Sequence, residues 1–225
     1  MPAVLDTTSP RAWAFALIGI NEYLQRFAGD RTIAQAREVL AGRLIELYRQ
    51  NRTDDWRWYE NSLTYCNAAL PHALLMCGQG MPNHDMTEAG LESLGWLADL
   101  QRAGDAGGHF VPIGSNGFYQ RGGERARFDQ QPVEAQAMVS ACLQAHRITG
   151  DKSWYKEARC AFDWFLGRND LNLPIYDPTT GGCRDGLHPD RPNENQGAES
   201  SLAFLQAVLE LRLAETTLAS VETGV

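Results

Sequence analysis

The stretch AQAMVSACLQAHRITGDKSWYKEARCAFDWFLGRN, residues 135–169, decides the fold that the sequence predicts. Its first half carries Ala and other small or apolar residues on all sides, which is typical of a helix packed on several faces. From residue 152 onward, charged and apolar residues recur with the period of an amphipathic helix. Gly150 and Asp151 between the halves are typical helix stop and start signals. The stretch therefore predicts two antiparallel helices joined by a short turn.

The same pattern begins again at Ala14 and Ala69, and Ser200 would begin a fourth unit. Short turns within each pair and long connections between pairs predict antiparallel α-hairpins, with the small-residue helix inside and the charged helix outside. The expected fold class is all-α, with antiparallel α-hairpins in a partial or complete α/α toroid that forms a single domain over residues 1–225. The periodicity gives about seven helices, over residues 9–28, 31–51, 61–79, 84–103, 131–149, 152–167 and 196–218.

Composition limits the classes of function. The chain has 225 residues, is 44% hydrophobic and carries a formal net charge of -8, so a nucleic-acid partner is not expected. Its most apolar stretch, Ala12–Ile20, is shorter than the roughly 20 residues that cross a bilayer, and no signal peptide is evident, so we expect a cytoplasmic protein without a membrane partner. The five cysteines form no CxxC motif and are expected to be buried thiols; we expect no metal and no cofactor.

Three polar loops precede predicted inner helices. They are DDWRWYEN (54–61), RFDQQPVEA (127–135) and CRDGLHPDRPNENQGAES (183–200). In a ring of antiparallel hairpins, the amino ends of all inner helices lie on one rim, so these loops would meet there. Two long irregular segments, 104–130 and 168–195, overlap the second and third of these loops. The first segment is expected to hold a short hairpin around SNG.

The residue types in these loops suit a saccharide. Sugar faces stack on aromatic rings, and sugar hydroxyls need amides and carboxylates in fixed positions. Glycoside hydrolysis uses two carboxyl groups, about 5–5.5 Å apart for retention and about 6.5–9.5 Å apart for inversion. The candidate catalytic carboxylates are Glu60, Glu134, Glu199, Asp55 and Asp185. The candidate substrate-binding residues are Trp56, Trp58, Tyr59, Asn67, Gln130, Gln131, His188, Asn195 and Gln196.

Each of these assignments has a structural alternative. Acids such as Glu134 and Glu199 in the first turn of a helix also stabilise the helix dipole. The aromatic side chains of 54–61 could equally pack between hairpins. If this loop is extended, Trp58 and Glu60 share one side, and we expect both to face the pocket while Trp56 or Tyr59 packs against the neighbouring hairpin.

Taken together, the hairpins, the Gly-Asp turns and the acid- and aromatic-rich loops resemble the α/α-toroid, or six-hairpin glycosidase, superfamily. The resemblance runs from about Ala14 to Leu211 and is carried by WRWYENSLTY (56–65), FDQQPVEA (128–135) and NENQGAES (193–200). Members of this superfamily include glycoside hydrolases, unsaturated-uronyl hydrolases and sugar epimerases, and similar domains accompany bacterial glycosyltransferases. A full toroid has twelve helices, so a chain with about seven is a shortened relative, an open arc or part of a larger protein.

The resemblance implies a carbohydrate-active protein, glycoside-hydrolase-like, with a carbohydrate as substrate or ligand. The alternative is a non-catalytic saccharide-binding or accessory domain associated with a glycosyltransferase. A sugar epimerase ranks lower, because a paired-histidine signature is not evident. A larger polypeptide or a homo-oligomer is a further expectation.

Overall fold

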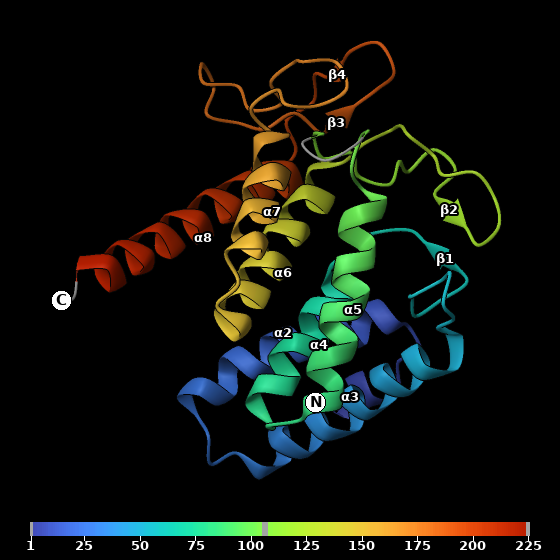
Figure 1. Ribbon diagram of the computed structural model, residues 1–225, viewed down its shortest axis with the longest axis vertical. Helices are drawn as coiled ribbons and strands as arrows, with labels where there is room; N and C mark the ends of the chain where they lie inside the picture. The colour runs from blue at the N-terminus through green and yellow to red at the C-terminus, as the bar shows by residue number, and fades with distance from the viewer. Residues whose placement is uncertain (1, 105–107, 224–225) are drawn as a thin grey trace. The chain divides into compact units, whose positions relative to one another are not determined.

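The computed structural model describes residues 2–104 and 108–223, and these are mainly helical (Figure 1). The all-α prediction is confirmed, and most helices begin and end within a few residues of the predicted bounds. In chain order the elements are α1 (Pro2–Leu5), α2 (Pro10–Arg26), α3 (Arg31–Asn51), β1 (Ser62–Leu63), α4 (Ala69–Gly80), α5 (His84–Leu100), β2 (Tyr119–Gln120), α6 (Pro132–Thr149), α7 (Lys152–Asp163), β3 (Gly186–Leu187), β4 (Pro192–Asn193) and α8 (Ala198–Thr223).

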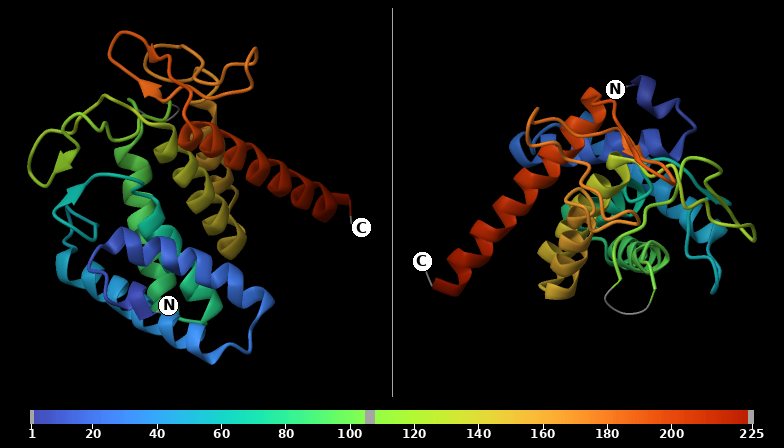
Figure 2. Two further views of the ribbon diagram at one scale, coloured as in Figure 1. Left: turned by 180° about the vertical axis from the view of Figure 1, so that it is seen from behind. Right: turned by 90° about the horizontal axis from the view of Figure 1, so that it is seen from above.

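The chain divides into two compact units. Unit 1 comprises Met1–Asn61 and Ala68–Leu97, and unit 2 comprises Ser62–Asn67 and Ala98–Val225. In unit 1, α2 packs against both α3 and α4, and α2 and α3 run side by side (Figure 2). Ser9 caps α2 and Asp30 caps α3, each accepting a backbone N–H of the first turn. The buried leucines at this contact include Leu17, Leu40, Leu44, Leu70 and Leu74.

The second hairpin of unit 1, α4 with α5, requires small residues at its contact. A Cβ atom added to Gly90 would lie 2.9 Å from Leu75 Cγ, and one added to Gly78 would lie 2.9 Å from the backbone N of Thr87. Glycine therefore allows these two helices to approach closely. This contact explains why glycines are tolerated inside two predicted helices.

In unit 2, α6 contacts α7 and also α8 (Figure 1). The turn predicted at Gly150 and Asp151 forms as expected between α6 and α7. Gly150 ends α6 with φ 71°, and the Asp151 carboxylate accepts the backbone N–H of Ser153 at the start of α7. Helix α6 is buried continuously from Pro132 to Ala135 and from Ala137 to Ala145, as its small apolar sequence predicts.

The helix predicted from residue 61 begins instead at Ala69. The intervening residues form β1, which pairs antiparallel with β2, and a loop that places Cys66 at φ 48°. The hairpin predicted around SNG is also wrong, because Tyr119 forms bridges with Leu63 and Arg125 rather than with the HFVPIG segment. Both errors have one cause: the strand partner of residues 119–120 is distant in sequence.

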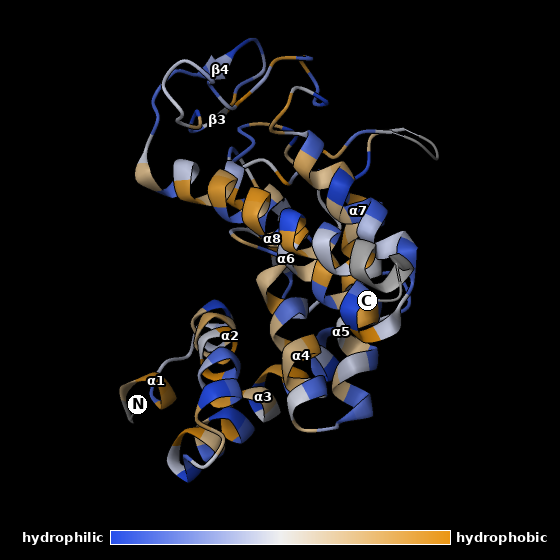
Figure 3. Ribbon diagram, turned by 90° about the vertical axis from the view of Figure 1, so that its left-hand side faces the viewer, coloured by the Kyte–Doolittle hydropathy of each residue, from blue (hydrophilic) through white to orange (hydrophobic). Residues whose placement is uncertain are grey.

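Helix α8 is apolar on two faces. Its inner residues Ala203, Phe204, Ala207 and Leu211 are buried. Its outer face carries a leucine stripe, Leu202, Leu205, Leu209 and Leu213, whose residues are 48% to 65% exposed. Figure 3 shows the resulting hydrophobic turns along this helix.

Candidate functional site

Two loops of unit 2 are joined by an antiparallel bridge. The backbone N–H of Gln130 donates to Leu187 O over 3.0 Å, and the N–H of Leu187 donates to Gln130 O over 2.9 Å. The next residue pair outward is Asp129 with His188, so their side chains lie on the same face. The His188 Nδ1 and Asp129 Oδ1 atoms are 2.5 Å apart. His188, a predicted binding residue, is therefore half-buried and oriented by a carboxylate.

The Gln130 side chain points to the opposite face, as alternation along a strand requires. Its Nε2 donates to Asp170 Oδ2 over 2.7 Å, and its Oε1 accepts the indole N–H of Trp164 over 2.7 Å. Gln130 is fully buried, which favours a structural role for its amide over the predicted contact with a substrate. Its amide instead joins the loop before α6 to the end of α7.

Asp170 is the centre of this buried network. Arg127 donates to both of its carboxylate oxygens, over 3.0 and 2.6 Å, and His109 Nε2 lies 2.8 Å from Oδ1. Burial alone would raise the pKa of Asp170, but hydrogen bonds from Arg127, His109 and Gln130 outweigh it and lower the pKa. No local sequence pattern distinguishes Asp170, because its three partners lie 40 to 61 residues away.

Glu134 holds the loop before α4 within unit 2. Its carboxylate accepts the backbone N–H groups of Cys66 and Asn67 and, over 3.0 Å, the side-chain amide of Asn67. Glu134 is 3% exposed and Asn67 is fully buried. These contacts favour a structural role for the pair, in place of the predicted catalytic role of Glu134 and binding role of Asn67.

Glu199 differs from Glu134. It lies in the first turn of α8, is exposed, and accepts the hydroxyl of Tyr65 over 2.7 Å. Burial and the Glu199 carboxylate together raise the pKa of Tyr65, so the phenol remains a donor at neutral pH. Tyr65 was not among the predicted site residues, because the helical periodicity of residues 61–79 predicts one continuous helix there.

The remaining predicted residues of unit 2 lie in the loop before α8. Asp185 accepts the backbone N–H of Gly197 over 2.7 Å, and its own N–H donates to Asn195 O. Gln196 is exposed, donates to Asp177 over 3.1 Å and accepts from Thr180. Asn195 is exposed, and Gln131 is half-buried at the N-cap of α6 without a side-chain capping bond.

The three aromatic residues of DDWRWYEN lie in the core of unit 1. Trp58 and Tyr59 are fully buried and Trp56 is 3% exposed. The ring centroid of Trp96 on α5 is 5.1 Å from Trp56 and 5.9 Å from Trp58. Trp58 is therefore packed in the core and does not line an accessible pocket, whereas the expectation that Trp56 or Tyr59 packs against the neighbouring hairpin is confirmed, because Trp56 contacts Trp96 and the Tyr59 hydroxyl is bonded to Ser93.

The acids of the same stretch are divided. Glu60 is paired with Arg11, which removes the argument that it needs a pocket to accommodate its charge. Asp55 is exposed in the loop that follows α3. Neither acid lies in unit 2, where the other predicted loops gather.

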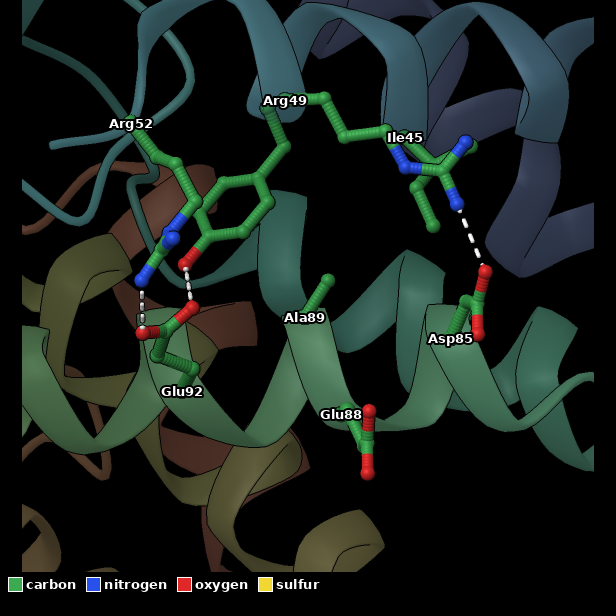
Figure 4. Close-up of a pocket in the computed structure, with 8 residues that line it drawn as sticks. Ile45, Arg49, Arg52, Asp85, Glu88, Ala89 and Glu92 are labelled. Carbon is green, nitrogen blue, oxygen red and sulfur yellow. Dashed lines mark hydrogen bonds and ion pairs between the residues drawn. The ribbon is translucent and has the colours of Figure 1, made fainter.

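A polar groove runs between α3 and α5 of unit 1 (Figure 4). Arg49 binds Asp85 over 2.7 Å, and Glu92 binds both Arg52 over 2.6 Å and the Tyr48 hydroxyl over 2.5 Å. Burial alone would raise the pKa of Glu92, but hydrogen bonds from Tyr48 and Arg52 lower it. Asp85 and Glu92 are each paired with an arginine, which favours a structural role for these two carboxylates.

The loops of unit 2 form a surface, which we term the unit 2 loop face. It is formed by residues 62–67, 108–131 and 168–197 beside the amino ends of α6 and α8, and the two long loops lie together in Figures 1 and 2. Its polar side chains include Tyr65, Asp129, His188 and Glu199.

Across residues 2–104 and 108–223, no group of three or more His, Cys, Asp or Glu residues is placed to hold a metal ion. None of the helices in that same part of the chain is long and apolar enough to cross a membrane.

Comparison with family models and with curated proteins gives no match. Among solved structures, the chain is similar to the GH76A alpha-1,6-mannanase from Salegentibacter sp. HEL1_6, with a TM-score of 0.65 and 12% sequence identity. The match covers 93% of this chain and 56% of the mannanase, so the chain spans about half the length of that structure. The likeness confirms the expected fold class, antiparallel α-hairpins arranged as in an α/α toroid.

Proposed function

We propose that this chain is a carbohydrate-active, glycoside-hydrolase-like protein whose saccharide site is the unit 2 loop face. The observation that carries the proposal is that hydrogen bonds join three loops, distant in sequence, beside the amino ends of α6 and α8. The bonds Glu134–Asn67, Tyr65–Glu199 and the Gln130–Leu187 bridge fix these loops to one another. A rigid scaffold that presents polar loop residues is where binding and catalysis concentrate.

The chemistry of this face suits sugar hydroxyls. Glu199 and Asp129 offer carboxylate acceptors, Tyr65 offers a phenol, and His188 offers an imidazole, each held by a partner. Of the carboxylates selected from sequence, Glu199 is the one in unit 2 that is exposed. It is therefore our candidate for the carboxylate that activates water or stabilises positive charge at the anomeric carbon.

The test is a glycan panel that includes α-1,6-mannan, because the similar structure is that of an α-1,6-mannanase. Binding and release of reducing sugar are measured in parallel. We expect Glu199→Gln to lower turnover at least 100-fold, roughly the contribution of one proton-transfer or charge-stabilising group, while the melting temperature changes little. Glu38→Gln, on the exposed surface of α3, is the matched control and should behave as the wild type. Unchanged turnover in Glu199→Gln would contradict the assigned role.

A second candidate is the non-catalytic saccharide-binding domain. It is favoured by the structural use of Glu134 and Glu60, two of the carboxylates that the sequence offered for catalysis. Binding of a panel glycan without any product would support this candidate. Four expectations stay predictions from the sequence: association with a glycosyltransferase, a cytoplasmic location, a larger polypeptide or homo-oligomer, and a sugar epimerase activity.

A further inference from the structure

We propose that Asp129 and His188 form a proton-transfer dyad, in which His188 Nε2 is the general acid that protonates the leaving oxygen of a glycoside. This inference rests on the proposed function and assigns a catalytic residue to it. His188 would be a catalytic residue, and Asp129 a positioning residue that acts through it.

The backbone fixes both members of the dyad. The Gln130–Leu187 bridge sets them opposite one another, and Leu187 is fully buried. On one side, Ser115 donates its backbone N–H to Asp129 O over 2.9 Å and its hydroxyl over 3.2 Å. On the other, the backbone N–H of His188 donates to Arg191 O over 2.9 Å. The imidazole and carboxylate are therefore held in place from two independent loops.

The contact between them also fixes which nitrogen carries a proton. An ionised carboxylate accepts hydrogen bonds but cannot donate, so Nδ1 of His188 is the protonated nitrogen that faces Asp129. The other ring nitrogen, Nε2, lies on the far side of the ring, where it can exchange a proton with a ligand. No residue within the described ranges 2–104 and 108–223 makes a side-chain hydrogen bond to Nε2. The side chains of His188 and Asp129 are 30% and 36% exposed, so a ligand can approach.

The other loop histidine provides an internal comparison. His109 also contacts an aspartate, but through Nε2, and that aspartate is shared with Arg127 and Gln130. The Asp170 carboxyl is 5% exposed, whereas that of Asp129 is 36% exposed. The His109 contact is therefore part of a buried structural network, and the His188 contact is an oriented, accessible acid–base group.

The proposed step balances without any redox partner. Protonated His188 transfers the Nε2 proton to the glycosidic oxygen as the bond from that oxygen to the anomeric carbon breaks, and the alcohol departs. Water adds to the anomeric carbon and gives its proton to Glu199, which then releases it to solvent. A proton from solvent then restores the imidazolium, so the net reaction is hydrolysis of one glycosidic bond.

The experiment compares two substrates of the same sugar. One is a panel oligosaccharide that the wild type cleaves, beginning with α-1,6-mannan, and the other is the corresponding 4-nitrophenyl glycoside, whose leaving group needs little protonation. For His188→Gln we expect kcat on the oligosaccharide to fall by about 10²–10⁴-fold, the usual contribution of a general acid. On the nitrophenyl glycoside the loss should be several-fold at most, and KM for both should change little. Added imidazole should restore part of the lost turnover.

Asp129→Asn should show the same substrate dependence with a smaller loss, because the amide can stabilise the wrong tautomer of His188. His84→Gln, on the exposed start of α5 in unit 1, is the matched control and should equal the wild type.

An equal loss on both substrates, or no loss, would overturn the dyad while leaving the proposed function intact. A wild type that binds a glycan but cleaves none would overturn the dyad and favour the binding domain, and a wild type that does neither would overturn both proposals.

Discussion

Trp58 and Trp164 are both fully buried, yet their indole N–H groups have different environments. Trp164 donates to Gln130 Oε1 over 2.7 Å. The indole N–H of Trp58 has no hydrogen-bond partner in the part of the chain that the structure describes. Comparing the two residues therefore distinguishes the stability contribution of a buried tryptophan's packing from that of its indole hydrogen bond.

The two tryptophans make a matched pair of substitutions. Both Trp58→Phe and Trp164→Phe remove similar volume from the core, so both should destabilise the protein. We expect Trp164→Phe to lower the free energy of unfolding by about 1–2 kcal/mol more, because it also leaves a buried amide oxygen without its donor. Urea denaturation of the two variants measures the difference. A larger loss for Trp58→Phe would show that the Trp58 indole has a role beyond packing.

Glu134 provides the second prediction at this scale. A glutamine at this position would turn an amide NH2 group toward donors that now meet a carboxylate. Glu134→Gln should therefore lower the free energy of unfolding by about 2–3 kcal/mol, in the range for buried hydrogen bonds to a charged group. Glu38→Gln on the surface of α3 serves as the control, measured in the same denaturant series. A variant of normal stability that loses turnover would return Glu134 to the catalytic candidates.

At the scale of elements, the carboxylate of Asp170 joins two long loops. Residues 108–131 contribute His109, Arg127 and Gln130, and residues 168–197 contribute Asp170 itself. Within these two loops, the only regular secondary structure in the described residues is strands of two residues each. Their conformation therefore depends on this buried ion-pair network more than on local propensity.

The network predicts a pH dependence. The pKa of Asp170 is lower in the folded protein than the unfolded value of about 3.9. Its contribution to stability is therefore fully present above about pH 4 and is lost as the pH falls through the lower, folded-state pKa. Asp170→Asn should lower stability at pH 6 and flatten the dependence of unfolding free energy on pH below about pH 4. Chemical denaturation at several pH values tests this, and an unchanged acid slope would contradict it.

At the scale of the whole molecule, five cysteines are free and four of them are buried. Burial raises the pKa of the Cys77 thiol to about 11 and that of Cys183 to about 12, and it raises the pKa of Cys142 as well. Thiolates, not thiols, react with disulfide reagents, so these cysteines should be inert in the folded protein. The half-buried Cys160 is the one that reagent can approach.

We expect a thiol-reactive dye to label at most one cysteine per native molecule, and all five after unfolding in urea. Reducing agent should leave the melting temperature unchanged, because the structure contains no disulfide among its described cysteines. Rapid labelling of several cysteines without denaturant would mean that one of the two units opens readily.

The helices and the hairpin turns could be predicted from the amino-acid sequence. Helical periodicity and capping are local, so the turn at Gly150 and Asp151 and the small apolar surface of α6 could be predicted from neighbouring residues. The fold class followed because repeated short turns leave antiparallel hairpins as the consistent arrangement, and the likeness to the mannanase structure confirms it.

Which polar residues contact one another depends on tertiary packing and could not be predicted from the sequence. Asp129 and His188 are 59 residues apart, and Glu134 and Cys66 are 68 apart, so no local pattern could distinguish an exposed dyad from a buried structural carboxylate. Trp58 was misassigned for a related reason: alternation along a strand shows which residues share a side, but not whether that side meets solvent or core. Loop conformation depends on hydrogen bonds between distant segments, and these exist only once the helices have packed.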